Sequence, residues 1–492
     1  MSSAEELYPP VPSSLGRMTP RALLQYVGPG FIIASVTIGS GELVLASRSG
    51  AVFGYSMLWV FLVAGFFKAI QVYSAGRYLA LTGEHPMTSW SRMPGPRYWF
   101  PLLIAIPTLA VMPIAFSAIS EILGSYLHDL SGGGDGEPVG AFGYKELWEN
   151  NWATAILSGC FVLALVSTLN TLEKISAIVL AILVCCVLIA VVVSQPDLLG
   201  VLEGLLVPRV GEFEPWVIES SSEFVGRSPW LEVALYLGAV GGGTYDYVGY
   251  IGLMRDKKWG LSAAGATSRE TIAEAIGQPG EAGESQLARA RLWTRAPLID
   301  TTLSFTAVVV VTLMFAVLGS ALLHEGQVII KDGDLLSQQE SFLTVLHPSL
   351  KWIYRTGVFL AFVGTLYGAF AIYQQTMAES VRALRSKELS ARARRRFRWA
   401  MMAYCYLGGL LLMWLPKSIV GGVVDRMTFG AVIGGAMFCG FWCLAMLWTD
   451  RVRLPKPLRM RWPLWLATLL GGIVMTGLGV WTLIVYFSPA VK

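Results

Sequence analysis

Long apolar runs with few charges limit the fold of this chain more than any other feature of its sequence. A helix needs about 20 residues to cross the apolar core of a bilayer, and continuous rather than alternating hydrophobicity excludes a membrane β-barrel. The sequence therefore predicts an all-α, polytopic membrane bundle of about 11 transmembrane helices. The expected spans are residues 28–48, 52–76, 99–124, 152–170, 174–194, 232–254, 297–322, 350–378, 398–416, 419–448 and 463–487.

The composition supports a surface that mostly faces lipid. Only 14% of the residues are charged and 54% are hydrophobic, whereas a soluble protein usually carries about 25% charged residues. We expect residues 26–492 to form one transmembrane domain. Residues 1–25 are polar, lack the apolar core of a signal peptide, and are expected to be a disordered cytoplasmic tail. All six cysteines lie in apolar segments, so no disulfide is expected.

The charges between the spans alternate in sign, which predicts the orientation of the chain. Arginine and lysine cluster after the second, sixth, eighth and tenth spans, whereas the loops after the third and fifth spans are acidic. By the positive-inside rule the N-terminus is cytoplasmic and the C-terminus lies outside, in a cell (inner) membrane. The basic run Arg392–Arg398 is interpreted as a contact with anionic lipid headgroups that fixes the topology, and nucleic acid is not an expected partner.

Two of the spans contain residues that weaken a helix near their middle. The first carries Gly39, Gly41 and the carboxylate Glu42, and the sixth carries Gly241–Gly243 followed by Thr244 and Asp246. Unwound backbone persists in a membrane only where it is buried in protein or lines a cavity. Interrupted helices in corresponding positions indicate an inverted-repeat secondary transporter. Its repeats would be residues 28–194 and 232–448, with 463–487 appended.

The two interruptions predict a substrate site near the middle of the membrane. Glycines in membrane helices often serve close helix packing, but a buried carboxylate beside each break favours a site. The predicted substrate-binding residues are Gly39, Ser40, Glu42, Gly242, Thr244 and Asp246. Tyr245, Tyr247 and Tyr250 are interpreted as aromatic packing, with substrate contact as the alternative.

Lys68 and Glu121 are the candidates for coupling transport to an ion. Lys68 lies in the middle of the second span and needs a partner, for which Glu42 or Glu121 is expected. A lysine ammonium can replace a coupling cation or carry a proton, and a static counter-ion is the alternative. Proton coupling therefore stays open.

The start of the first span resembles the Nramp (natural resistance-associated macrophage protein) family of divalent-metal transporters. That resemblance implies a LeuT-type fold with a 5+5 inverted repeat and broken helices 1 and 6. The end of the eighth span, Gln375–Glu379, is also similar to the family. The matching segments near the start are Gly28–Gly30, Arg48–Gly50, Phe53–Tyr55, Leu58–Val60 and 81–83.

The chain departs from the family at the expected site. Where the family has Asp-Pro-Gly-Asn in helix 1, this sequence has Gly39-Ser40-Gly41-Glu42, and Gly242-Gly243-Thr244 replaces Met-Pro-His in helix 6. A metal site is predicted from Glu42 and Asp246 together with carbonyl and hydroxyl oxygens. Without a thioether ligand, such a site suits a hard cation.

The predicted function is therefore secondary active transport of a divalent metal cation of the Mg, Mn or Fe class by alternating access. A transporter of the same fold for a small organic solute, such as an amine or amino acid, is the alternative. No cofactor is expected. The sequence contains neither an HExxH nor a GxSxG motif and no Gly-rich phosphate loop, so an enzyme is not expected either.

Overall fold

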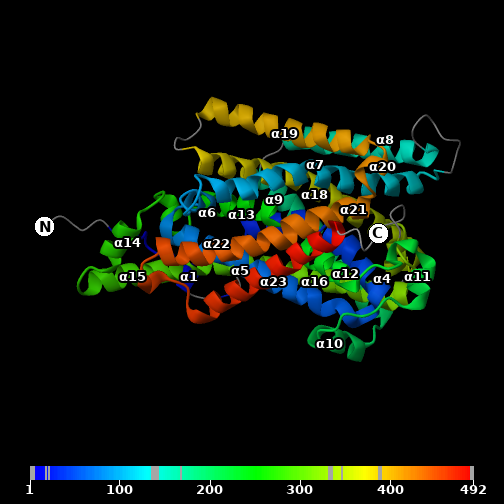
Figure 1. The fold of residues 1–492 in the computed structure, drawn as a ribbon, viewed down its shortest axis with the longest axis horizontal. Helices are drawn as coiled ribbons and strands as arrows, with labels where there is room; N and C mark the ends of the chain where they lie inside the picture. The colour runs from blue at the N-terminus through cyan, green and yellow to red at the C-terminus, as the bar shows by residue number, and fades with distance from the viewer. Residues whose placement is uncertain are drawn as a thin grey trace.

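The computed structural model describes residues 6–16, 19, 23–133, 143–166, 169–330, 336–344, 347–385 and 390–487. Within these residues all of the regular secondary structure is helical. The longest helices run roughly along one axis of the molecule (Figure 1). One end carries the N-terminus with α14 (Arg269–Ile276) and α15 (Glu281–Trp293), and the C-terminus lies at the other end with α20 (Lys417–Val420).

Each of the eleven predicted spans contains helix, which confirms the all-α membrane bundle. The first and sixth spans are each divided, as the sequence predicted. The elements are α3 (Pro29–Thr37) with a π-helix (Ser40–Leu45) and α4 (Ala46–Phe53), α5 (Leu58–Thr82), α7 (Trp99–Leu130), α8 (Tyr144–Val166), α9 (Leu169–Ser194), α12 (Pro229–Ala239) with α13 (Thr244–Asp256), α16 (Arg295–Leu318), α18 (Lys351–Leu384), α19 (Ala391–Met413), α21 (Val423–Gly430) with a π-helix (Ala431–Met437) and α22 (Phe438–Arg453), and α23 (Trp462–Phe487).

Length and composition alone identify fewer spans than the sequence pattern does. In the described part of the chain, 7 helices are long and apolar enough to cross a membrane, or up to 8 if Val184–Ser194 and Leu198–Leu206 form one span bent by 118°. The difference has a physical cause. The halves of a broken span are too short to be counted singly, and α19 begins with a series of arginines.

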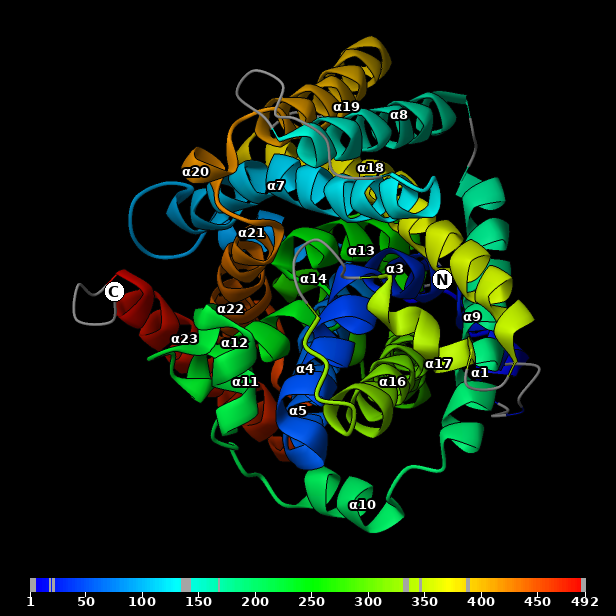
Figure 2. The same ribbon diagram turned by 90° about the vertical axis from the view of Figure 1, so that its right-hand side faces the viewer.

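The helices form two groups with the broken spans between them. Helices α7, α8, α18 and α19 lie together on one side, and α5, α16, α22 and α23 lie on the other (Figures 1 and 2). Between the groups, α13 packs against both α18 and α5, and α3 packs against both α18 and α16. The interrupted backbone therefore lies at the interface of the two groups.

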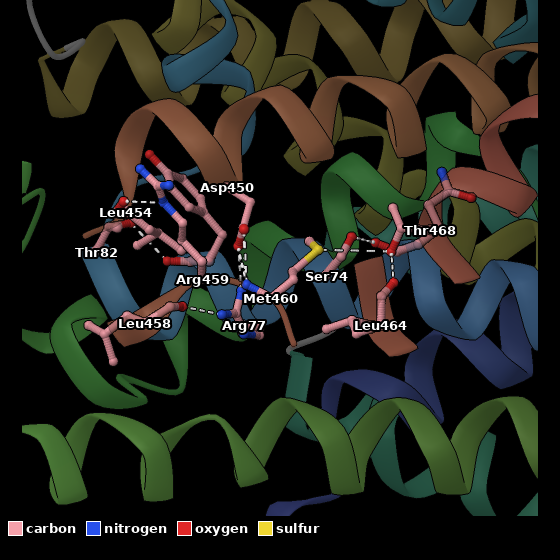
Figure 3. A network of polar contacts seen from close by, with 12 residues as sticks. Ser74, Arg77, Thr82, Asp450, Leu454, Leu458, Arg459, Met460, Leu464 and Thr468 are labelled. Carbon is pink, nitrogen blue, oxygen red and sulfur yellow. Dashed lines mark hydrogen bonds and ion pairs between the residues drawn. The ribbon is translucent and has the colours of Figure 1, made fainter. Parts of the chain in front are cut away.

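A buried ion pair joins the second, tenth and eleventh spans near the end that carries the N-terminus. Arg77 of α5 donates to Asp450 of α22 at 2.9 Å and also to the carbonyl of Leu458. The other Asp450 oxygen accepts from the backbone of Met460 at 2.9 Å, just before α23 begins (Figure 3). Because both charges are buried and hydrogen-bonded, this network holds the appended helix α23 against the first repeat.

Residues 6–16 belong to the predicted disordered tail, yet they pack on the bundle. Tyr8 is fully buried, its hydroxyl donates to the Leu81 carbonyl at 2.8 Å, and its amide donates to Gln286 at 2.8 Å. The indole of Trp293 donates to the Pro9 carbonyl at 3.0 Å. Burial of an aromatic ring together with these hydrogen bonds favours order where polarity alone predicted disorder. The remaining tail residues lie outside the described part, apart from residues 19 and 23–25.

Candidate functional site: two helix breaks facing one cavity

The break in the sixth span depends on glycines in a left-handed conformation. Helix α12 ends at Ala239, Gly241 and Gly242 have φ of +76° and +80°, and α13 begins at Thr244. Residues with a Cβ adopt this conformation at a cost of roughly 1–2 kcal/mol each. The glycine run therefore interrupts the helix and leaves carbonyls of residues 238–242 free to accept from other groups.

The break in the first span lies directly against the break in the sixth. Helix α3 ends at Thr37, and Ile38 and Gly39 leave the helical conformation before the π-helix begins at Ser40. A Cβ on Gly41 would lie 2.6 Å from the Ala239 carbonyl oxygen, so only glycine permits this approach. The two interruptions thus meet inside the bundle, as the sequence predicted.

Glu42 and Asp246 occupy equivalent places beside the two breaks. Each lies three residues after the residue that caps its half-helix, and each carboxylate reaches back to that cap. Asp246 accepts a hydrogen bond from the Gly243 amide at 2.8 Å. Glu42 Oε2 accepts from the Gly39 amide of its own cap, and Glu42 Oε1 accepts from the Gly241 amide of the sixth span at 2.6 Å. Glu42 therefore links the two broken spans through a charge-assisted hydrogen bond.

Lys68 binds the unwound backbone of the sixth span. Its ammonium donates to the carbonyls of Gly238, Val240 and Gly242 at 2.7, 2.5 and 2.7 Å. An ammonium has three N–H donors, so these three carbonyls use all of them. Lys68 thus occupies a position where several carbonyl oxygens converge, which is the arrangement that also coordinates small cations.

The expected partners of Lys68 are not its direct partners. Among the described residues, Lys68 forms no ion pair with Glu42 or Glu121. Glu121 instead pairs with Arg426 of α21, with N···O distances of 2.7 and 2.5 Å. Arg426 also donates to Ser117 at 2.9 Å, and all three side chains are buried. The prediction of a Lys68–Glu121 pair is therefore wrong, because Arg426 approaches Glu121 from a distant part of the chain.

A cavity of about 90 Å³ lies between the two breaks and the α7–α18 side of the bundle. Of the predicted substrate-binding residues, Gly242 and Asp246 line it, and Gly39, Glu42 and Thr244 do not. Thr244 instead donates to the Cys439 sulfur at 3.4 Å. The side chain of Ser40 lies outside the described part of the structure.

Several cavity residues were not predicted from the sequence. Arg426 lines the cavity and was not predicted. It lies seven residues inside the predicted tenth span, and a charge within a membrane span could have marked it as a candidate. Thr365 lies 3.4 Å from the Ile38 carbonyl, and no local pattern marked it. Tyr245 and Tyr373 line the cavity in an edge-to-face pair, whereas Tyr247 donates to the Gly241 carbonyl and Tyr250 to Asp300. Of Tyr245, Tyr247 and Tyr250, Tyr245 therefore faces the cavity.

The acidic groups near the cavity are few. In the part of the chain that the structure describes, no group of three or more His, Cys, Asp or Glu residues is placed to hold a metal ion. Asp246 is the acidic residue among the cavity-lining residues. An ion in the cavity would therefore be held by one carboxylate with hydroxyl, carbonyl or water oxygens.

Replacing Gly242 with alanine should disrupt the site. A Cβ there would lie 2.6 Å from Thr37 Cγ2 and 2.7 Å from Asp246 Oδ2, at a positive φ. We expect a loss of about 1–2 kcal/mol from the conformation alone and a further loss of substrate binding from displacement of Asp246. Gly477→Ala, at a glycine with open space around it, is the matched control. Equal thermal midpoints and equal substrate binding for both variants would contradict this role for Gly242.

Residues 30–218 match the family described as "Natural resistance-associated macrophage protein-like". Among relatives, the metal transporter Nramp3 of Oryza sativa subsp. japonica is 26% identical over 193 residues, and the metal transporter Nramp1 of Populus trichocarpa is 27% identical over 197 residues. Residues 30–218, less than half of the chain, are therefore similar to the Nramp family. Each alignment covers 38% of this chain and 32% of the relative, so the match spans about a third of the relatives' length.

The likeness to solved structures extends over nearly the whole chain. The crystal structure of the Eremococcus coleocola manganese transporter bound to an aromatic bis-isothiourea substituted compound aligns with a TM-score of 0.66, at 15% identity, over 99% of this chain and 92% of that one. A mutant of that transporter aligns with a TM-score of 0.67 at 16% identity, over 97% and 90%. These likenesses confirm the predicted LeuT-type fold.

The matched Nramp segment contains only half of the site. Residues 30–218 include Glu42 and Lys68, whereas Asp246 and Arg426 lie beyond it. The part of the site that lies in the second repeat therefore has to be interpreted from its own geometry.

Proposed function

We propose that the protein is a secondary transporter that moves a divalent metal cation across the membrane by alternating access. The observation that carries this proposal is the Asp246 carboxylate, which lines a buried cavity at the meeting point of two helix breaks. The similarity of residues 30–218 to the Nramp family and the metal-transporter names of the relatives support it. A buried carboxylate in a membrane protein is costly and usually serves an ion pathway.

The balance of charge around the cavity favours a cation. Arg426 and Glu121 neutralise each other directly, and Lys68 and Glu42 both bind the backbone between Gly238 and Gly242 with opposite charges. Asp246 is left without a cationic partner within ion-pair distance among the described residues. With all five side chains ionised, the formal charges sum to one net negative charge, that of Asp246, which would attract a cation that keeps part of its hydration shell.

The alternating-access mechanism rests on the broken helices. We propose that the repeats 28–194 and 232–448 move so that the half-helices around the cavity shift relative to the α7–α8–α18–α19 group. Glu42 would hold the two breaks together during this movement, because its carboxylate accepts from the Gly39 amide of the first break and from the Gly241 amide of the sixth-span break. Of the two predicted metal residues, we propose Asp246 as the direct ligand, whereas Glu42, which does not line the cavity, would act through the backbone of the two breaks.

We also propose the orientation that the charge pattern predicts, with the N-terminus in the cytoplasm and the C-terminus outside. The termini lie at opposite ends of the bundle, as an odd number of crossings requires (Figure 1). The same orientation places the arginines of α19 at the cytoplasmic face.

Uptake of Mn²⁺ and Mg²⁺ into proteoliposomes tests the role of Asp246. Asp246→Asn removes the charge and keeps the size of the side chain, so we expect uptake at low ion concentration to fall by about tenfold to a hundredfold, the equivalent of one charge-assisted contact. The matched control is Asp425→Asn, which removes a carboxylate that caps α21 through Gly422 and does not line the cavity.

Two results would contradict the proposal. Equal losses in both variants would indicate a general effect of removing a helix cap. Full uptake by Asp246→Asn, in protein with a normal thermal midpoint, would show that the carboxylate is not a ligand.

A small zwitterionic solute such as an amino acid is the second candidate substrate. The observation in its favour is that Arg426 lines the same cavity as Asp246, so that one wall is cationic and another anionic. Tyr245 and Tyr373 add aromatic surface. An amino-acid uptake screen in the same proteoliposomes separates the two candidates, because a metal transporter should show no amino-acid uptake that depends on Asp246.

A further inference from the structure

A separate cavity of about 360 Å³ lies between α8, α18 and α19. The first half of α19, which contributes four of its residues, lies toward the end of the bundle that carries the N-terminus (Figure 1). Its volume is within the range of roughly 300–1,000 Å³ that is usual for ligand sites. Two guanidinium groups and one amide line it together with an indole and apolar side chains. The lining residues are Ala164, Leu165, Gln374, Arg395, Arg398, Trp399 and Met402.

The two arginines of this cavity are available for a ligand. Arg395 and Arg398 are exposed, and neither has an ion-pair or hydrogen-bond partner among the residues that the structure describes. They are three residues apart on α19, so their side chains emerge from the same face of the helix. Two unpaired guanidinium groups on one cavity wall are well suited to bind a phosphate group.

The helices that line the cavity also carry exposed apolar side chains, which a soluble anion would not contact. On α19, Leu407 and Leu411 are 60% and 63% exposed, and on α8, Val162 and Val166 are 55% and 80% exposed. Trp399 is 46% exposed at the cavity, and indole rings favour the boundary between headgroups and acyl chains. A cationic cavity beside exposed apolar helix faces matches the two parts of a phospholipid.

We propose that this cavity binds the headgroup of an anionic phospholipid, with Arg395 and Arg398 contacting its phosphate and the acyl chains lying along α8 and α19. Basic pockets between membrane helices at the cytoplasmic side hold lipid headgroups in this way. Because α8, α18 and α19 belong to one helix group, the lipid would stabilise that group while the broken spans move. Lipid binding at this cavity does not depend on which substrate the protein transports.

Native mass spectrometry of the full-length protein in detergent, titrated with phosphatidylglycerol or phosphatidylcholine, tests the proposal. The test variant is Arg395→Gln with Arg398→Gln. The matched control is Arg392→Gln with Arg396→Gln, which removes the same charge from exposed positions of the same helix outside the cavity. We expect the test variant to bind phosphatidylglycerol about thirtyfold more weakly than the wild type, roughly fivefold for each arginine near the membrane surface.

The control variant should retain phosphatidylglycerol binding within about twofold, since screened charges at a distance contribute little. Equal losses in the two variants would overturn the proposal, because they would show attraction by the whole basic segment rather than a site. Displacement of the lipid by low millimolar glycerol 3-phosphate would also overturn it in favour of a soluble anion. A thermal midpoint measured for each variant separates loss of binding from loss of folding.

Discussion

Replacing Lys68 with methionine is expected to abolish transport and to lower the free energy of unfolding by about 3 kcal/mol or more. Methionine keeps the length and the apolar part of the side chain but leaves three buried carbonyls without a donor, each at a cost of roughly 1–3 kcal/mol. Those carbonyls belong to Gly238, Val240 and Gly242, which form the break itself. Thermal unfolding in detergent and uptake into proteoliposomes measure the two effects.

Lys68→Ala tests whether the ammonium takes the place of a bound ion. This variant leaves both the carbonyls and the space of the side chain, so an inorganic monovalent cation should occupy the site. We expect Na⁺ or K⁺ at about 100 mM to raise its thermal midpoint relative to choline, through the linkage of binding to folding. The wild type should show no such dependence. A stable Lys68→Ala protein whose thermal midpoint does not respond to these ions would show that the ammonium does not take the place of a bound ion.

The same donor count explains how Lys68 could couple the site to protons. A neutral amine has two N–H donors and a lone pair, so it cannot satisfy three carbonyls at 2.5–2.7 Å. Loss of a proton would therefore weaken the hold on the broken helix α12–α13 and favour its rearrangement. A lysine that binds backbone carbonyls, rather than one paired with a carboxylate, thus links charge to helix geometry.

The spans and breaks were predictable because their signals are local in the sequence. Apolar runs of membrane length and the sign of the loop charges do not depend on tertiary contacts. Gly241 and Gly242 marked the sixth-span break because consecutive glycines are unfavourable in a helix, and the structure places both at positive φ. Asp246 was predicted on the same local grounds and lines the cavity.

The residues that were missed or misassigned depend on contacts between distant parts of the chain. Arg426 and Glu121 are separated by 305 positions, and Lys68 and Val240 by 172. The hydrophobic periodicity of a sequence does not indicate which buried charged residues form a pair. Glu42 shows the same limit, because its local pattern predicted a ligand, whereas its strongest contact is the Gly241 amide of the other repeat.

Removing one member of the buried ion pair between Arg426 and Glu121 is expected to lower the stability of the protein strongly. Removing one member of a buried pair leaves an uncompensated charge and costs about 3–5 kcal/mol. We therefore expect Glu121→Gln and Arg426→Leu each to lower the thermal midpoint strongly. Replacing both residues with leucine should restore most of the stability, because an apolar pair of similar volume often matches a buried ion pair. A double variant as unstable as the sum of the two single variants would show that the residues do not act as a pair.

The double variant also distinguishes the two candidate substrates. Arg426→Leu with Glu121→Leu removes one positive and one negative charge, so the net charge around the Asp246 cavity is unchanged. Transport of a divalent cation should then remain within about tenfold of the wild type, since the attraction of Asp246 persists. Transport of an amino acid should disappear, because the guanidinium that would bind its carboxylate is absent. Metal uptake by the folded double variant supports a cation site, and loss of all metal uptake would favour a direct role of Arg426 in binding.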